Sequence, residues 1–527
     1  MSRQQSILTS TTIDGSAWSS VQTVLSRLFA AGTGIVVARF LSPSSFGEAA
    51  EAAAVGTSMM VLMPGSLVDV LIARWSRFPR DTKLAGHVAF RIGLSMCLVT
   101  AVVAGVWLIR SPTSWVPWLL LIYAARPLFE AFTVVPLSLL RTSLHFKHIA
   151  ISDTVASLLS SFAGIVFAIS TRSPLALAIP PVILIASRAL IYKRFARSRV
   201  ATESDKHLIP SHLLRDWLPA TLSQYVHTLV VTVDLLLLAV FGTSVAMGYY
   251  SFAISVALQA QSIFVLQLSS TLQPVLSTMN DEVPRQTAAI ARTLKFLSAV
   301  SVPVAAFQIC ISESLIRVVF GKEWVPAWPV FALTCVTMAV GAGAGPLTAL
   351  LKARGWFVKI LWWQFGHLVV LSSVLAVIAA NAPNIAARLD QAWGLDLLNC
   401  ETFLPSVIAA VVGLSWIASV PIGLMLALRI TNPLHAFRLV GLGTPVVVCL
   451  PLAALAFWLS ARLALWLPPI SADLLTILVV GPLVLLLAMV GTARLDSGVR
   501  ADLLLLLSKA RNQIGKRRNP TRITKAT

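Results

Sequence analysis

The chain alternates between long apolar runs and short polar turns from Ala17 to Gly491. A helix needs about twenty apolar residues to cross the hydrocarbon core of a bilayer, and runs of that length recur throughout this interval. A membrane barrel would show short strands of alternating hydrophobicity, unlike the continuous runs Val446–Leu459 and Leu474–Val490. Only helices and closed barrels satisfy the backbone in lipid, so the pattern predicts an all-α membrane protein.

Fourteen segments are apolar enough for transmembrane helices, which makes the predicted protein polytopic. They are 17–40, 48–72, 86–109, 115–140, 150–170, 174–192, 217–241, 249–273, 296–320, 327–350, 358–380, 403–428, 438–460 and 472–493. The predicted arrangement is two six-helix bundles followed by a C-terminal helix pair, a division that depends on the internal repeat described below. The expected parts are a cytoplasmic N-terminus (1–16), a first lobe (17–192), a basic cytoplasmic linker (193–216), a second lobe (217–430), a terminal helix pair (431–493) and a basic cytoplasmic tail (494–527).

Composition supports this class. Hydrophobic residues make up 57% of the 527 residues and charged residues 12%, with a mean hydropathy of +0.83, outside the range of soluble chains. The net charge of +20 lies in short loops and the tail, beside apolar spans, which indicates membrane lipids rather than nucleic acid as the partner. The five cysteines form no CxxC or Cys/His spacing, so no disulfide framework, metal or cofactor is expected.

Basic residues alternate between the two sides of the membrane, loop by loop. The richer side carries the clusters within Arg74–Lys83, Arg141–Lys147 and Lys193–Arg215, and the tail from Arg494. Cytoplasmic loops are enriched in Lys and Arg, so both termini are predicted on the cytoplasmic side of a bacterial inner membrane. The polar stretch Met1–Asp14 lacks the pattern of a removable signal peptide.

Two turns, six helices apart, share a motif. The first predicted helix ends with Phe40 and a short turn to Gly47, and the seventh ends with Phe241 and a short turn to Gly248. The two phenylalanines and the two glycines align without a gap. An even number of intervening helices leaves both copies in the same orientation, which predicts two halves related by an axis along the membrane normal. The alternative is a chance likeness between two short turns.

Five segments carry a resemblance to a known family: Ala17–Gly47, Leu140–Lys147, Asp234–Tyr250, Phe320–Pro329 and Leu351–Gly355. In order and spacing they resemble the polysaccharide flippases of the multidrug/oligosaccharidyl-lipid/polysaccharide exporter superfamily, the Wzx-type lipopolysaccharide and exopolysaccharide transporters. The resemblance covers the first twelve predicted helices. The last two helices are expected in fourteen-helix members.

The resemblance implies a transporter and not an enzyme. Its substrate would be an isoprenoid-diphosphate-linked oligosaccharide, moved to the periplasmic leaflet for lipopolysaccharide or exopolysaccharide biosynthesis. The implied mechanism is alternating access between two lobes, driven by an ion gradient, with a polysaccharide polymerase and a chain-length regulator as partners. The sequence itself contains no Gly-x-x-x-x-Gly-Lys-Ser/Thr motif for ATP.

Charged residues inside apolar spans are costly and are therefore candidates for function. Arg27 lies about ten residues into the first predicted helix, roughly 15 Å deep. Its guanidinium is suited to hold a diphosphate or a sugar acid through two hydrogen bonds. The alternative is a structural pair with a carboxylate on another helix.

Two carboxylates are candidates for coupling to a proton or a sodium ion. Asp234 lies within the apolar run Leu229–Val240, where it needs a partner or water. Glu130 follows Arg126 by four residues on the fourth predicted helix, so the two side chains share a face. A structural partner role is the alternative for Asp234, and a self-neutralised pair is the alternative for Glu130.

Polar side chains gather on the seventh and eighth predicted helices. Gln224 and Tyr225 on the seventh, and Gln259 and Gln261 on the eighth, are suited to contact sugar hydroxyl groups. The alternative for each is an interhelical hydrogen bond, which polar side chains often form in membranes.

Two predicted helices contain residues that interrupt regular helix, Pro64-Gly65 and the run Gly341–Pro346. Such interruptions let a helix bend during a change of access. The alternative is close packing against a neighbouring helix.

Two other functions stay open. A polysaccharide polymerase or ligase would be a membrane enzyme, usually with a substantial periplasmic loop, and the only sizeable outer stretch here is Asn381–Glu401. A small-molecule multidrug exporter of the same superfamily would share the architecture but favour acidic cavity groups. Arg27 favours an anionic, lipid-linked substrate instead.

Overall fold

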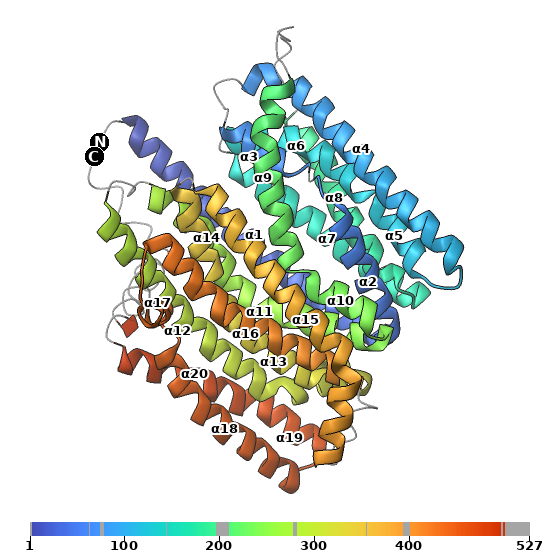
Figure 1. The fold of residues 1–527 in the computed structure, drawn as a ribbon, viewed down its shortest axis with the longest axis vertical. Helices are drawn as coiled ribbons and strands as arrows, with labels where there is room; N and C mark the ends of the chain where they lie inside the picture. Colours follow the sequence, from blue (N-terminus) through green and yellow to red (C-terminus); the bar gives the residue numbers. More distant parts are fainter. Residues whose placement is uncertain are drawn as a thin grey trace, which may run out of the picture. The chain divides into compact units, whose positions relative to one another are not determined.

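The structure is a computed structural model that describes residues 3–62, 64–73, 78–143, 145–196, 210–277, 282–354, 356–393, 401–496 and 499–500. These residues form helices and turns without a strand (Figure 1). The helices are α1 (Arg3–Phe40), α2 (Pro43–Met59), α3 (Ser66–Ala73), α4 (Phe78–Arg110), α5 (Val116–Ala124), α6 (Arg126–Thr142), α7 (Phe146–Thr171), α8 (Leu175–Ala196), α9 (Pro210–Val230), α10 (Val233–Phe241), α11 (Ser244–Ser277), α12 (Val283–Leu315), η3 (Ile316–Phe320), η4 (Lys322–Ala327), α13 (Trp328–Gly341), α14 (Ala344–Ala353), α15 (Phe357–Trp393), α16 (Phe403–Leu428), α17 (Pro433–Val440), α18 (Gly443–Trp466), α19 (Pro469–Leu475), η5 (Thr476–Val480) and α20 (Gly481–Leu495).

Eleven helical stretches among the described residues are long and apolar enough to cross a membrane. A bent pair, Trp217–Val230 with Val233–Phe241, makes twelve if it is counted as one span. The other two of the fourteen predicted spans, 48–72 and 249–273, fall on α2 with α3 and on α11. The all-α, multi-pass class is therefore confirmed, while the count of fourteen spans stays a prediction.

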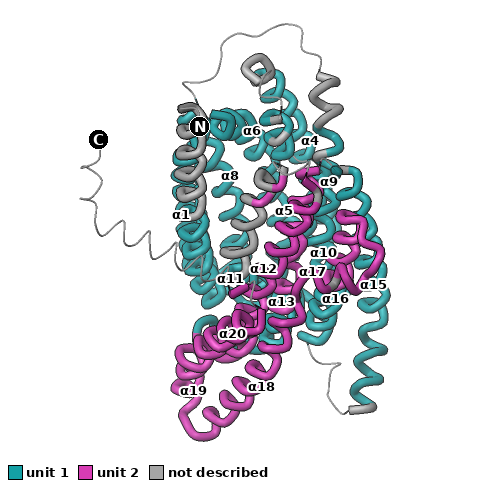
Figure 2. The backbone as a smooth tube through the Cα atoms, turned by 90° about the vertical axis from the view of Figure 1, so that its left-hand side faces the viewer, with its two compact units in different colours: residues 1–259, 319–334, 355–415 teal, residues 260–318, 335–354, 416–527 magenta. Residues whose placement is uncertain are grey.

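The chain forms two compact units whose segments interleave along the sequence (Figure 2). Unit 1 contains residues 1–259, 319–334 and 355–415, and unit 2 contains residues 260–318, 335–354 and 416–527. The division into lobes at 17–192 and 217–430 rests on the sequence repeat and stays a prediction.

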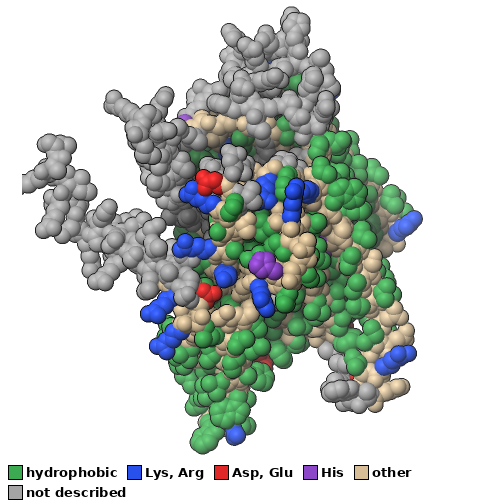
Figure 3. Space-filling model, turned by 60° about the vertical axis from the view of Figure 1, so that its left-hand side comes forward, with side chains coloured by type: hydrophobic (Ala, Val, Ile, Leu, Met, Phe, Trp, Pro, Cys, Tyr) green, Lys and Arg blue, Asp and Glu red, His purple; other side chains and the backbone are tan. Residues whose placement is uncertain are grey.

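Within unit 1, small residues bring the helices close together. α7 packs against α1 and α8, α6 packs against α4 and α8, and α2 packs against α5. Ala49 and Ala52 of α2 are buried against Leu119 of α5, because small side chains let helix backbones approach in a membrane. Val102 and Ile109 of α4 are exposed, as expected for contact with lipid chains. Hydrophobic side chains likewise cover broad areas of the surface in Figure 3.

Within unit 2, α12 packs against α18 and α20, and a polar cluster joins α12 and η3 to α19. Asp473 is buried and accepts a hydrogen bond from the Ser314 hydroxyl at 2.8 Å. Arg317 forms an ion pair with Asp473 at 3.2 Å and a second one with Glu313. The buried carboxylate therefore has both a hydroxyl donor and a cation.

Two helices depart from the predicted bounds. The span predicted to end at 380 continues as α15 to Trp393, because Ala382 and Ala386, one turn apart, are both buried. The predicted outer loop from Asn381 is thus helical over its first part. The span predicted to begin at 438 begins instead with α18, since Gly441 adopts a φ of +73° and ends the separate short helix α17.

Several spans are broken in the middle. The break between α2 and α3 contains Pro64-Gly65, and the break between α13 and α14 follows Gly341, so both predicted interruptions are present. Two further breaks separate α5 from α6, ahead of Pro127, and α9 from α10, where the axis bends by 48°. Each break frees backbone groups that need partners inside the membrane.

Asp473→Ala is expected to lower the free energy of unfolding by about 2 kcal/mol, because it leaves Arg317 and the Ser314 hydroxyl without their buried acceptor. The matched control is Glu282→Ala, which removes an ion pair with Arg285 whose side chains are 59% and 66% exposed. That pair should contribute less than about 0.5 kcal/mol. Thermal unfolding of the purified protein in detergent measures both, and equal shifts of the midpoint would contradict the assignment.

Candidate functional site

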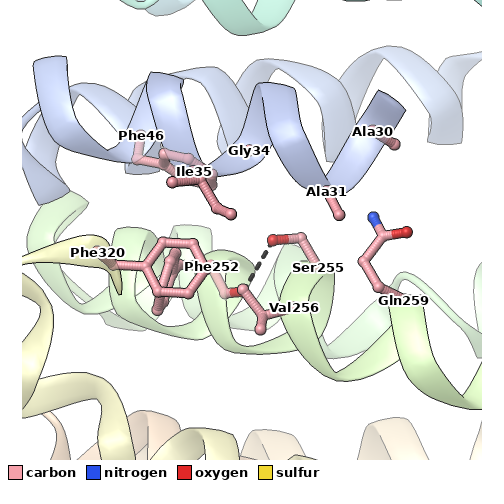
Figure 4. Close-up of a pocket in the computed structure, with 10 residues that line it drawn as sticks. All are labelled: Ala30, Ala31, Gly34, Ile35, Phe46, Phe252, Ser255, Val256, Gln259 and Phe320. Carbon is pink, nitrogen blue, oxygen red and sulfur yellow. Dashed lines mark hydrogen bonds between the residues drawn. The ribbon is translucent and has the colours of Figure 1, made fainter. Parts of the chain in front are cut away.

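A cavity of about 120 Å³ lies within unit 1, between α1 and α11 (Figure 4). It is lined by Ala30, Ala31, Gly34, Ile35, Phe46, Phe252, Ser255, Val256, Gln259 and Phe320. The three phenylalanines lie at one end, and Ala30, Ala31 and Gln259 lie at the other (Figure 4). α1 belongs to the first predicted lobe and α11 to the second, so residues of both lobes bound the cavity.

The cavity is small for a transport substrate. It has room for a few water molecules, whereas pockets for small organic ligands have volumes of roughly 300–1,000 Å³. The helices around it therefore have to move apart before a molecule of that size can enter.

Two of the predicted substrate residues belong to this region. Gln259 lines the cavity, with its amide opposite α1 (Figure 4). Arg27 is half-buried and lies three and four residues before Ala30 and Ala31, so it shares their face of α1 one turn away. Gln261 lies on α11, but its side chain is outside the described residues.

The other two predicted substrate residues, both on α9, do not line the cavity. The Tyr225 hydroxyl donates a hydrogen bond to the Ser58 carbonyl oxygen at 3.1 Å, close to the C-terminal end of α2. Gln224 is exposed on the same helix. The geometry of Tyr225 is that of an interhelical hydrogen bond, which was the alternative to sugar binding.

Asp234 is buried in the first turn of α10, directly after the break in the seventh predicted span. Its carboxylate accepts a hydrogen bond from the Tyr250 hydroxyl at 2.6 Å and one from the Leu235 N–H at 2.8 Å. The N-terminus of a helix also stabilises a negative charge. No Lys, Arg or His among the described residues forms an ion pair with Asp234.

Glu130 lies against the break between α2 and α3. Its carboxylate accepts a hydrogen bond from the Gly65 N–H, and a Cβ on Gly65 would overlap its Oε1 atom. A glycine is therefore needed for this approach. Arg126 lies one turn earlier on α6, and its buried Nε atom makes no hydrogen bond to a described residue.

Five further residues of unit 1 were not predicted as site residues from the sequence. Glu48 and Glu51 are both half-buried, and their spacing of three residues puts them on one face of α2. A charge within a predicted span was the signal that could have found them. Phe46, Phe252 and Phe320 gave no signal, since an apolar side chain reads as lipid-facing until its neighbours are known.

Candidate metal ligands and cysteine thiols can be located in the described part of the chain. No group of three or more His, Cys, Asp or Glu residues there is placed to hold a metal ion. Four cysteines in that part, Cys97, Cys310, Cys335 and Cys449, are free. Cys400 lies outside the described residues.

The helices and the cavity among them define a multi-pass helical membrane protein with charged side chains inside its spans. Residues 36–329, more than half of the chain, match the polysaccharide biosynthesis protein family. The protein belongs to this family.

Three curated relatives are similar to this chain over part of their length. The teichuronic acid biosynthesis protein TuaB of Bacillus subtilis (strain 168) is 22% identical over 298 residues, which cover 54% of this chain and 59% of TuaB. The succinoglycan biosynthesis transport protein ExoT of Rhizobium meliloti (strain 1021) is 22% identical over 170 residues, 32% of each chain. An uncharacterized membrane protein in the cps region of Klebsiella pneumoniae is 24% identical over 132 residues, 25% of this chain and 27% of that protein. Each match spans less than two thirds of the relative.

Solved structures share the fold. The lipid II flippase MurJ in an inward closed conformation superposes with a TM-score of 0.63, at 15% identity, over 89% of this chain and 97% of MurJ. An inward-facing multidrug resistance transporter of the MATE family and MOP superfamily gives a TM-score of 0.56, at 15% identity, over 78% of this chain and 96% of that transporter. At such low identity the likeness establishes the fold alone.

Tyr250→Phe is expected to lower the free energy of unfolding by about 2 kcal/mol, because the buried Asp234 carboxylate loses a donor. Tyr123→Phe is the matched control, since Tyr123 is also buried but its hydroxyl makes no hydrogen bond to a described residue. Thermal unfolding compares the two variants. The same small shift in both would show that Asp234 does not depend on this bond.

Proposed function

We propose that the protein moves an isoprenoid-diphosphate-linked oligosaccharide from the cytoplasmic to the periplasmic leaflet of the bacterial inner membrane. The transported unit serves lipopolysaccharide or exopolysaccharide biosynthesis. The observation that carries the proposal is the cavity between α1 and α11, bounded by both predicted lobes, in a chain of the polysaccharide biosynthesis family. The relatives named for teichuronic acid biosynthesis and succinoglycan transport support the same substrate class.

Arg27 is the proposed ligand for the diphosphate. It shares a helix face with the cavity-lining Ala30 and Ala31, and a guanidinium binds phosphate oxygens through two parallel hydrogen bonds. Gln259 supplies an amide at the same end of the cavity, suited to sugar hydroxyl groups. Gln224, Tyr225 and Gln261 are proposed to contact the sugar when the helices around the cavity have moved apart.

Ion coupling is assigned to Asp234 and Glu130, the carboxylates beside two broken spans. Asp234 is buried with a hydroxyl donor and a backbone donor, and Glu130 receives the Gly65 N–H. A carboxylate in a membrane binds a proton or a sodium ion when it lies near a water-filled path. Movement of the helix breaks then links that binding to the change of access.

The proposal also includes the setting of the protein. Both termini lie on the cytoplasmic side, as the alternation of basic loops predicts. A polysaccharide polymerase and a chain-length regulator act on the transported unit on the periplasmic side. No catalytic step is assigned to the chain.

A small-molecule multidrug exporter is the second candidate. It is favoured by the MATE-type fold and by Glu48 and Glu51, two acidic side chains on one face of α2. An exporter of cationic compounds would confer resistance to them, and its loss would leave the surface polysaccharide intact. Testing the deletion strain for drug sensitivity as well as for polymer separates the two functions.

Deletion of the gene is expected to abolish the surface polysaccharide and to cause lipid-linked intermediate to accumulate in the inner leaflet. Extraction and mass spectrometry of the lipid-linked sugars, with polymer assayed on whole cells, measure both effects. A strain that keeps its polymer and accumulates no intermediate would reject the flippase function.

Arg27→Ala is expected to lower polymer export by about thirtyfold or more, since a charge-assisted hydrogen bond contributes roughly 2 kcal/mol or more. The amount of protein in the membrane should not change. Arg110→Ala is the matched control, because Arg110 is exposed at the end of α4 and does not line the cavity between α1 and α11. Equal export by the two variants would remove Arg27 from the binding site.

A further inference from the structure

α2 and α11 cross at their N-terminal ends through two glycines. A Cβ on Gly47 would overlap the backbone oxygen of Ser244, and a Cβ on Gly248 would overlap the backbone oxygen of Pro43. The obstacle is backbone in both cases, so no change of side-chain rotamer relieves it. The two glycines are the pair that the internal repeat aligns, and their contacts are reciprocal, as an axis passing between them requires.

An aromatic cluster lies beside this crossing. The Trp324 ring of η4 stacks on Phe252, with ring centroids 4.3 Å apart, and meets the Phe46 ring edge-on at 5.2 Å. Phe252 meets Phe320 edge-on at 4.9 Å. The three phenylalanines also form one end of the cavity (Figure 4). Aromatic rings therefore line the end of the cavity beside the glycine crossing, since Phe46 precedes Gly47 and Phe252 follows Gly248 by one turn.

Two hydrogen bonds join the same elements to the last turn of α1. The Trp324 Nε1–H donates to the Ala38 oxygen at 2.7 Å, and the Arg39 Nε–H donates to the Val319 oxygen at 2.7 Å. Carbonyl groups in the last turn of a helix have no partner within the helix, so the Ala38 oxygen is available to the indole. Both bonds connect the first predicted lobe to η3 and η4 of the second.

We propose that the Gly47–Gly248 crossing, the aromatic cluster and these two hydrogen bonds form the outer gate of the transport path. The inference rests on the proposed transport function and on the predicted orientation, which puts the turn Leu41–Gly47 on the periplasmic side. The gate closes the cavity toward the periplasm and separates once in each transport cycle.

The Gly47–Gly248 crossing is suited to repeated separation. The two glycine surfaces meet without interdigitated side chains, so they separate and re-form without rotamer changes. The cavity next to the joint has too little volume for a lipid-linked sugar, so the helices bounding it must part during transport. The alternative is a permanent pivot, which would hold α1, α2, α11 and η4 together throughout the transport cycle. The experiments below distinguish such a fixed contact from a gate that opens.

Adding a methyl group at the crossing should hold the gate open. Ser255, which lines the cavity, is replaced by Cys in a protein whose five native cysteines have been replaced. Gly47→Ala or Gly248→Ala is then expected to raise the labelling rate of this cysteine by about tenfold when spheroplasts receive a membrane-impermeant maleimide, because strain in the closed state shifts the population toward the open state.

Gly105→Ala and Gly366→Ala are the matched controls, since a Cβ at either position has no atom within 4 Å and should leave labelling unchanged. Size-exclusion chromatography and thermal unfolding confirm that each variant is folded. Unchanged labelling in folded Gly47→Ala and Gly248→Ala variants would overturn the gate. The labelling needs no knowledge of the substrate, so its failure is distinct from a failure of the proposed function.

Locking the joint is the second measurement. A double variant in the same background carries Arg39→Cys and Val319→Cys, and a short bifunctional methanethiosulfonate joins the two cysteines. Polymer export is expected to fall by at least about tenfold after cross-linking. It should recover when the mixed disulfides are reduced. The two single-cysteine variants control for the reagent. Full export by the cross-linked protein would show a fixed pivot and reject the gate. If the double-cysteine variant is inactive before cross-linking, the cysteine labelling in the Gly47→Ala and Gly248→Ala variants decides between gate and pivot.

Discussion

A backbone amide or carbonyl freed from a helix inside a bilayer costs several kcal/mol unless another group bonds it, and much of this structure depends on that constraint. The spans are broken at several places, so partners have to come from side chains. In unit 1 the pairs beside breaks are Tyr225 with the Ser58 carbonyl and Glu130 with the Gly65 amide. At the ends of α1 and η3, the pairs are Trp324 with the Ala38 carbonyl and Arg39 with the Val319 carbonyl. Polar residues in the spans thus support irregular backbone.

The same constraint connects stability to function. Irregular backbone at membrane depth is tolerated where it is buried in protein or lines a water-filled path. A polar side chain that supports a break therefore lies beside irregular backbone in the protein interior. Asp234 follows one break and Glu130 lies against another, so a structural role for these carboxylates is compatible with the ion coupling proposed for them.

The fold was predictable because a span needs a minimum apolar length, and the breaks at Pro64-Gly65 and after Gly341 follow from residue types that interrupt helices.

The site was predictable only in part. Gln259 was predicted because it is a polar residue within an apolar span. The hydrogen bond from Tyr225 to Ser58 joins residues 167 positions apart, so no local sequence pattern predicts it. The aromatic cluster was hidden because its members resemble lipid-facing residues. The stretch after Asn381, with its polar residues and a proline, read as a loop, and only the burial of its alanines explains its helix.

α15 has 37 residues, so at 1.5 Å per residue it is about 55 Å long against a hydrocarbon core of about 30 Å. It packs against both α9 and α10, the two segments on either side of the bend before Asp234 (Figure 1). A continuous helix packed against both sides of a bend restricts it. The bend angle changes only if this helix slides or if one of the two helix–helix contacts separates. The stiffness of this bend is therefore a property of α9, α10 and α15 together.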